Sequence, residues 1–154
     1  IVFSTIGTTQ SRVNFDKAEY RKVDHDITLN IAKSCKKYNV KKFIYVSTAG
    51  AYKGSKNFYA DLKGEIDESV KKLNLFSTII YRPSLLLGKR KEKRFGERIA
   101  QIVMPFFSYF MPNNYKPIHA IYVAQSMKNI SKLNMNGLSI LHYDEIIKTS
   151  KDKY

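Results

Sequence analysis

The sequence is poor in cysteine, proline and glycine. Its 154 residues include one cysteine, four prolines and seven glycines. A single cysteine, Cys35, excludes an internal disulfide framework and suits a reducing compartment. No stretch resembles a signal peptide, and the longest apolar run, residues 102–112, is too short to span a bilayer and contains two prolines. We therefore expect one globular domain over residues 1–154 in the cytoplasm, with no transmembrane segment and with residues 102–112 buried or interfacial.

Acidic residues are also scarce. The chain has 13 Asp and Glu against 27 Lys and Arg, a net charge of +14. Such a charge would suit nucleic acid or an anionic membrane, but no zinc-ligand, helix-turn-helix or RNP pattern accompanies it. The three histidines are dispersed without ligand spacing, so no metal site is expected. A lysine-rich solvated surface is the favoured interpretation. The alternative is that part of the charge faces an anionic ligand, such as the phosphates of a cofactor.

Hydrophobic periodicity predicts strands that alternate with helices. Strand-like runs occupy residues 1–9, 43–47 and 76–88, the last stopped by Pro83, and helical spacing covers residues 19–38, 58–73, 94–107 and 120–133. A short strand and a short helix occupy residues 137–151. This order implies an α/β fold, a doubly wound parallel sheet with helices on both faces. In such sheets ligands bind outside the carboxyl ends of the strands, which here are rich in small and hydroxyl residues.

Tyr59 and Lys63 stand four residues apart in FYADLKGE, residues 58–65. Residues with that spacing share one face of a helix. A neighbouring ammonium lowers the pKa of a tyrosine from its ordinary value of about 10, which suits acid/base chemistry. The spacing alone is not specific, because Tyr38 and Lys42 repeat it. Only the first pair follows a strand that ends in hydroxyl residues, where Thr48 could hold a substrate oxygen opposite the tyrosine.

Three segments in order carry a family resemblance: VSTAGA (46–51), YADLK (59–63) and YRPSLLLG (81–88). They resemble the short-chain dehydrogenase/reductase superfamily, and are most similar to its atypical, Tat-interacting-protein-like group of NAD(P)H-binding oxidoreductases. That group also shares a GTT turn, a VD helix start, an Arg- and Glu-containing stretch and a late VA helix, here at residues 7–9, 23–25, 89–97 and 123–124. The resemblance spans nearly the whole chain and implies a Rossmann-type sheet.

The resemblance implies a role for each matching residue. Tyr59 would be the catalytic acid/base, and Lys63 its tuning lysine and a ligand of the nicotinamide ribose. Thr48, with Ser47 as the second choice, would orient the substrate. The cofactor would be NADP or NAD, with NADP slightly preferred. Besides Tyr59 and Lys63, the implied cofactor contacts are Ile6 and Gly7 on the adenosine side, Pro83, Leu85 and Leu86 at the nicotinamide end, and Arg94.

Two departures from the family pattern stand out. Asp24 stands where many members have an asparagine, which puts the usual proton relay in doubt. The family's opening Gly-x-x-Gly-x-x-Gly turn, which holds the pyrophosphate, is not found in the sequence. By resemblance about 60–70 residues, the first strand–helix units, are missing, so the chain looks like the carboxyl-terminal part of a domain. The strand at its start would then be an unpaired apolar edge, and the chain by itself is expected to bind cofactor poorly.

The implied function is hydride transfer between NAD(P)H and a small carbonyl or alcohol substrate. One alternative is a nucleotide-sugar epimerase or dehydratase, which uses the same three residues on a bound NAD. The stretch after Gly88 leaves little room for a sugar-nucleotide domain. A second alternative is an NAD(P)H-binding regulatory protein without turnover. The third, nucleic-acid binding, rests on charge alone, and no specific nucleic-acid partner is expected. The sequence leaves a homodimer open.

Overall fold

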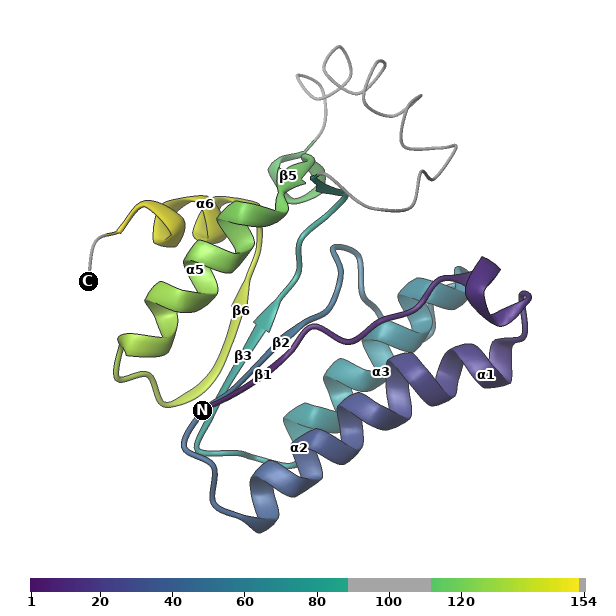
Figure 1. Ribbon diagram of the computed structural model, residues 1–154, viewed down its shortest axis with the longest axis horizontal. Helices are drawn as coiled ribbons and strands as arrows, with labels where there is room; N and C mark the ends of the chain where they lie inside the picture. The colour runs from purple at the N-terminus through teal and green to yellow at the C-terminus, as the bar shows by residue number, and fades with distance from the viewer. Residues whose placement is uncertain (89–111, 153–154) are drawn as a thin grey trace.

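A four-stranded parallel sheet forms the centre of the molecule (Figure 1). The structure is a computed structural model and describes residues 1–88 and 112–152. The strands are β1 (Val2–Ser4), β2 (Phe43–Val46), β3 (Ser77–Tyr81) and β6 (Gly137–Leu141), in the order β1-β2-β3-β6. β2 and β3 are rich in β-branched and aromatic residues and are buried on both faces, as parallel strands covered by helices must be. The predicted fold class is therefore confirmed.

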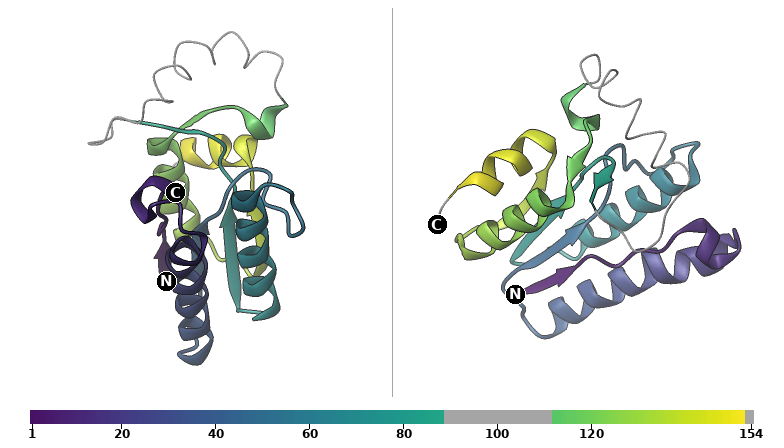
Figure 2. Two further views of the ribbon diagram at one scale, coloured as in Figure 1. Left: turned by 90° about the vertical axis from the view of Figure 1, so that its right-hand side faces the viewer. Right: turned by 45° about the horizontal axis from the view of Figure 1, so that its top comes forward.

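Helices cover both faces of this sheet (Figures 1 and 2). One layer contains α1 (Lys17–Arg21), a π turn η2 (Lys22–Asp26), α2 (Ile27–Lys37) and α3 (Phe58–Lys72). The other contains α5 (Ala120–Lys132) and α6 (Tyr143–Lys151). These bounds confirm the helices expected at residues 19–38, 58–73 and 120–133 and at the chain's end. The helix expected at residues 94–107, and the apolar run up to residue 111, lie outside the described residues.

Short elements complete the fold. Two 3-10 turns, η1 (Gln10–Val13) and η3 (Asn113–Tyr115), lie in the connections. β4 (Leu86–Leu87) pairs in parallel with β5 (Ile118–His119) as a second small sheet. This pairing was not predicted, because two residues make no periodic pattern. It joins the loop after β3 to the start of α5.

Each face of the main sheet has its own apolar core. Beneath α5 and α6, the buried cluster is Ile44, Ile79, Tyr81, Ile118, Val123, Met127, Ile130, Leu141 and Ile146. Beneath α2 and α3, it is Ala32, Cys35, Phe43, Tyr45, Ile66, Val70, Leu75 and Ile80. β2 and β3 contribute alternate residues to the two clusters, as the pleat of a strand requires.

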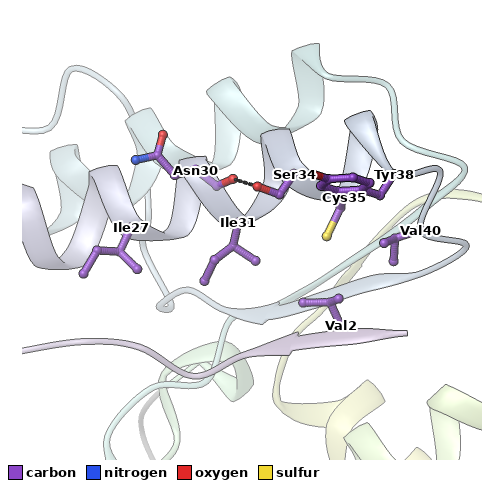
Figure 3. Close-up of a pocket in the computed structure, with 8 residues that line it drawn as sticks. All are labelled: Val2, Ile27, Asn30, Ile31, Ser34, Cys35, Tyr38 and Val40. Atoms are coloured by element: carbon purple, nitrogen blue, oxygen red, sulfur yellow. Dashed lines mark hydrogen bonds between the residues drawn. The ribbon is translucent and has the colours of Figure 1, made fainter.

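The β1 side of the sheet is incompletely covered in the described part of the chain. β1 pairs with β2 and with no other described strand, and it has three residues where a longer run was predicted. Phe3 is 48% exposed. A groove of about 500 Å³ lies between this strand and α2, and its lining includes Val2, Ile27 and Ile31. In Figure 3 the side chains of Ile27 and Ile31 point from α2 toward the β1 side. Sheet continuation at such an apolar edge is physically favourable.

Candidate active site

A pocket lies at the carboxyl ends of the strands, the edge where a ligand was expected. Its volume is about 650 Å³, and the loops after β1, β2 and β3 all contribute to it. Thr48 and Tyr59, the predicted substrate-orienting and acid/base residues, both line it. The full lining is Thr8, Thr9, Gln10, Ser11, Phe15, Tyr20, Thr48, Tyr59, Ser84, Leu85 and Leu86. Hydroxyl groups and aromatic rings predominate in this lining.

Tyr59 stands in the first turn of α3. Asn57 caps that helix by accepting a hydrogen bond from the Ala60 N–H at 3.1 Å. The Tyr59 ring meets the Tyr20 ring edge to face, with centroids 6.4 Å apart. Tyr20 is itself buried, and its hydroxyl donates to the Thr8 carbonyl at 3.3 Å. Tyr59 is 37% exposed, so its ring is supported on one side and faces the open pocket on the other.

Lys63 lies one helical turn after Tyr59 and is buried. Its Nζ is 5.9 Å from the centroid of the Tyr59 ring, on the helix face that the spacing predicted. The same Nζ forms an ion pair with Asp24 Oδ1 at 2.8 Å. Asp24 Oδ2 accepts the Thr8 N–H at 2.7 Å. The structure therefore brings Tyr59 and Lys63 together and adds a buried carboxylate that the sequence had marked only as a departure.

The π turn explains why Asp24 points inward. The segment Lys22–Asp26 interrupts an otherwise α-helical run, and the consecutive residues Asp24 and His25 are both buried. A regular α-helix turns successive residues by about 100°, whereas a π turn re-aims them locally, and such turns are frequent at functional sites. His25 Nδ1 lies 2.8 Å from Asp26 Oδ1, and its Nε2 is buried with no hydrogen-bond partner in the described part of the chain.

Thr48 and Ser47 occupy different environments. The Ser47 N–H donates to the Tyr81 carbonyl at 2.7 Å, which continues the β2–β3 ladder. The Ser47 hydroxyl is buried, lies outside the pocket lining and has no partner among residues 1–88 and 112–152. The Ser4 hydroxyl, near the end of the neighbouring strand, is buried in the same way. Thr48 is therefore the hydroxyl residue of this strand end that faces the pocket.

The residues expected to contact the cofactor lie in the loop after β1 (residues 6–7), in the loop after β3 (residues 83–86) and at residue 94. Ile6 is 37% exposed, and the α-carbon of Gly7 lies so near Asp24 that a β-carbon there would be 3.4 Å from Oδ1. The Pro83 carbonyl accepts the Ala49 N–H at 2.8 Å and so ties together the loops after β2 and β3. Leu85 and Leu86 follow it and line the pocket. Arg94 lies outside the described residues.

Sequence reasoning did not single out several lining residues. Tyr20 fitted only a helical pattern, and Phe15 and Ser84 stood in connections without a motif. Phe15 adopts a left-handed conformation with φ 61°, which no apolar pattern indicates. The Gly-Thr-Thr turn was the one local signal for this wall, because its second and third residues, Thr8 and Thr9, line the pocket.

The described residues contain neither a metal-binding cluster nor a membrane-spanning helix. No group of three or more His, Cys, Asp or Glu side chains among them is placed to hold a metal ion. Within the same residues, no helix combines the length and apolarity needed to cross a membrane.

The sequence is similar to fungal proteins named FMP52. "Protein FMP52, mitochondrial" of Candida albicans is 30% identical over 155 residues, a match that covers 96% of this chain and 67% of that protein. The Emericella nidulans protein is 38% identical over 101 residues, and the Candida glabrata protein 41% over 96 residues. These shorter matches span 43% and 40% of the relatives, so less than half of their length. No family model matches the chain.

Solved structures share the fold at low sequence identity. UDP-N-acetylglucosamine 4-epimerase from Methanobrevibacter ruminantium superposes with a TM-score of 0.65 at 15% identity, over 96% of this chain and 58% of that one. The dTDP-4-dehydrorhamnose reductase of Bacillus anthracis, solved with NADP, gives 0.62 at 15% identity, over 91% and 54%. At such identities the likeness concerns the fold alone, a Rossmann-like α/β fold that the chain shares with these epimerases and reductases.

The relatives correct the expected location. A cytoplasmic protein was expected, and that expectation is wrong, because the relatives from Emericella nidulans, Coccidioides immitis and Candida albicans are all named mitochondrial. The physical reason is that a low cysteine content reports redox conditions and not a cellular address. The expectation rested on the single cysteine and on the lack of a signal peptide in residues 1–154. Neither observation distinguishes one reducing compartment from another.

Proposed function

Because the chain belongs to the FMP52 family, we propose that it provides the nicotinamide and substrate end of an NAD(P)H-dependent oxidoreductase site. One observation carries the proposal: Thr48 and Tyr59, from different elements, line one pocket, and Lys63 lies beside the Tyr59 ring. Within the short-chain dehydrogenase/reductase fold, the motifs at residues 7–9, 46–51, 59–63 and 81–88 favour the atypical, Tat-interacting-protein-like group. Residues 1–154 would belong to one dinucleotide-binding domain, and the relatives' names favour a mitochondrial location.

A nicotinamide dinucleotide fits part of this chain. The pocket lining presents the hydroxyl groups of Thr8, Thr9 and Thr48 at the strand ends, and such groups suit the polar ribose and amide of a dinucleotide. Lys63 would hold the nicotinamide ribose, Ile6 and Gly7 would pass the adenosine side, and Pro83, Leu85 and Leu86 would contact the nicotinamide end. Arg94 would contact the cofactor through its positively charged guanidinium group. No residue of the chain is assigned to the pyrophosphate, since the glycine-rich turn is not in the sequence.

The proposed reaction is reduction of a carbonyl to an alcohol, or its reverse. When bound, a reduced nicotinamide would supply the hydride that the carbonyl carbon accepts and would be oxidised in return. Thr48 donates a hydrogen bond that orients the carbonyl oxygen. Tyr59 gives its phenolic proton to that oxygen, so a C–H and an O–H bond form as the carbonyl π bond breaks. Lys63 stabilises the resulting phenolate by its positive charge, and the phenolate regains a proton from solvent.

The pocket favours a neutral substrate. Its described lining combines hydroxyl groups, an amide, three aromatic rings and two leucines, and contains no charged side chain. A small carbonyl compound with apolar surface fits this chemistry. A nucleotide-sugar diphosphate would be expected to find basic side chains, so the lining counts against the epimerase alternative. The likeness to solved epimerases counts for it, and the reaction test separates the two.

The test is NADPH oxidation by the whole protein with 9,10-phenanthrenequinone as the carbonyl probe. Tyr59→Phe should slow turnover by about 10²–10⁴-fold, the usual contribution of a general acid. Tyr38→Phe is the matched control, because Tyr38 has the same spacing to Lys42, is 70% exposed and lies outside the pocket. Turnover that survives Tyr59→Phe unchanged would refute the assignment. Interconversion of UDP-sugars without net NADPH consumption would favour the epimerase instead.

A further inference from the structure

Asp24 holds two donors with its two oxygens. Oδ1 lies 2.8 Å from Lys63 Nζ, and Oδ2 accepts the Thr8 N–H at 2.7 Å. Asp24 is 1% exposed and Lys63 5% exposed, so the pair is shielded from water. A buried ammonium without a counter-charge would be costly, and this carboxylate compensates it.

The geometry requires a carboxylate at this position. The Lys63 ammonium and the Thr8 amide are donors only, and a carboxylate accepts at both oxygens. An asparagine amide would offer one oxygen to one donor and would turn its NH₂ group toward the other. The family resemblance led us to expect an asparagine at residue 24. The two donors around this residue explain why the chain has an aspartate there instead.

The three groups connect the pocket wall to the catalytic helix. Thr8 lines the pocket, Lys63 follows Tyr59 on α3, and Asp24 is aimed between them by the π turn Lys22–Asp26. We propose that Asp24 is a positioning residue that locks the Lys63 ammonium beside Tyr59 and fixes the loop after β1 (residues 5–9) at the pocket. These contacts of Asp24 with Lys63 and Thr8, the Asp24 lock, are a property of the fold. The effect of this lock on turnover rests on the proposed function.

The lock is tested by lysine labelling of the whole protein with an amine-reactive ester, read out residue by residue by mass spectrometry. Lys42 is the matched control, because it is 6% exposed and donates to the backbone carbonyls of Ile130, Ser131 and Leu133 instead of to a carboxylate. In the wild type, both lysines should react far more slowly than the exposed Lys37. In Asp24→Asn, Lys63 should react about tenfold faster or more, while Lys42 keeps its wild-type rate.

Two results would overturn the lock. One is wild-type Lys63 reacting as fast as Lys37, and the other is Lys63 staying fully protected in Asp24→Asn. If Asp24→Asn unfolds, Lys42 and Lys63 will both become reactive, and hydrogen exchange of the wild-type Thr8 amide decides instead. That amide should be strongly protected by its bond to Asp24, and exchange at the rate of an unstructured amide would contradict the lock.

The catalytic consequence has a separate readout. With NADPH and 9,10-phenanthrenequinone, Asp24→Asn should lower kcat by about tenfold to a hundredfold, since a misplaced catalytic group is costly even when the shift is small. The Kd for NADPH should change less, because most cofactor contacts lie elsewhere. An equal loss in both, or none in kcat, would refute the positioning role. If the wild type oxidises no NADPH, the proposed function fails, while the labelling result still decides the lock.

Discussion

Two buried aspartates form ion pairs at α3, and they have different partners. Asp24, in the π turn η2, pairs with a lysine of α3, and Asp67 belongs to α3 itself. Asp67, on α3, is fully buried, with Oδ1 accepting the Tyr45 hydroxyl at 2.7 Å. Its Oδ2 accepts Arg82 Nε at 2.9 Å and Nη2 at 2.7 Å. Asp24 likewise has a cationic and a neutral donor, which are Lys63 and the Thr8 amide. By composition alone the two networks look equivalent.

Their positions separate them. Tyr45 is in β2, and Arg82 is the residue that follows β3, so Asp67 ties α3 to the sheet. None of these three residues lines the pocket that contains Tyr59. The partners of Asp24 are a pocket-lining loop residue and the lysine that follows Tyr59. A buried carboxylate is thus informative about function through the cavity that its partners face, and burial by itself does not distinguish the two.

Among substitutions away from the pocket, Asp67→Asn is expected to cause the largest loss of stability. The substitution leaves Arg82 without a counter-charge, and breaking a buried pair in this way costs about 3–5 kcal/mol. The lower end, about 3 kcal/mol, is expected because the Arg82 side chain is 17% exposed and partly solvated. Urea unfolding measures the change. NADPH turnover of the folded variant should stay near wild type, and a selective loss of kcat would erase the distinction between the two aspartates.

Tyr45→Phe should cost less, about 2 kcal/mol, because it removes one hydrogen bond to a charged acceptor. Tyr81→Phe is the matched control on the opposite face, where the hydroxyl bonds Ser126 Oγ at 2.9 Å, and it should cost about 1 kcal/mol. Chemical unfolding of both variants at neutral pH gives the comparison. Equal losses would mean that the charge of Asp67 adds nothing to the Tyr45 bond.

The same two tyrosines should make the folded protein less stable at high pH. Burial raises the pKa of Tyr81 to about 12 from 10.0, and burial, followed by the Asp67 charge, raises the pKa of Tyr45 further. An acid whose pKa is raised by folding gives stability that is complete below its unfolded pKa and is lost as pH rises. Unfolding free energy should therefore fall from pH 10 toward pH 12. In Tyr45→Phe the fall should be shallower, and an unchanged slope would contradict the assignment.

The smallest effect is expected at the Arg21–Glu65 bridge, which joins α1 to α3 near the π turn. Two 2.7 Å bonds form it, and the hydrogen bond from Arg21 lowers the pKa of Glu65 from 4.5. A lowered carboxyl pKa gives stability that is present above 4.5 and is lost as pH falls through the lower folded value. The side chains are 41% and 31% exposed, so Glu65→Gln should cost under about 1 kcal/mol near pH 7. A loss well above about 1 kcal/mol would contradict the view that this bridge is a solvent-screened surface pair.

The sequence allowed much of the fold to be predicted, and the reasons are local. β2 and β3 are unbroken apolar runs, and α2, α3 and α5 have apolar residues at helical spacing, so each element is encoded within its own residues. Tyr59 and Thr48 were placed in one site because carboxyl ends of parallel strands meet at one edge. The Asp24–Lys63 pair joins residues 39 positions apart through a π turn, which depends on tertiary packing and leaves no periodic trace.

The remaining gaps have similar causes. Phe15 and Tyr20 reach the pocket through the conformation of a connection, which composition does not encode. β4 and β5 each have two residues and pair across a long separation in the chain. The cytoplasmic location was inferred from the single cysteine and from the lack of a targeting signal in residues 1–154, and the cysteine content does not distinguish one reducing compartment from another.

The most direct test of the central claim is a fluorescence titration of the whole protein with NADPH. We expect saturable binding that Tyr59→Phe leaves nearly unchanged, because the phenol acts in chemistry more than in binding. Lys63→Met should weaken that binding by about tenfold, equivalent to about 1.4 kcal/mol, because the ribose loses a charged partner. If the wild type shows no saturable binding, or if folded Lys63→Met binds NADPH as tightly as the wild type, Lys63 is not part of a nicotinamide site.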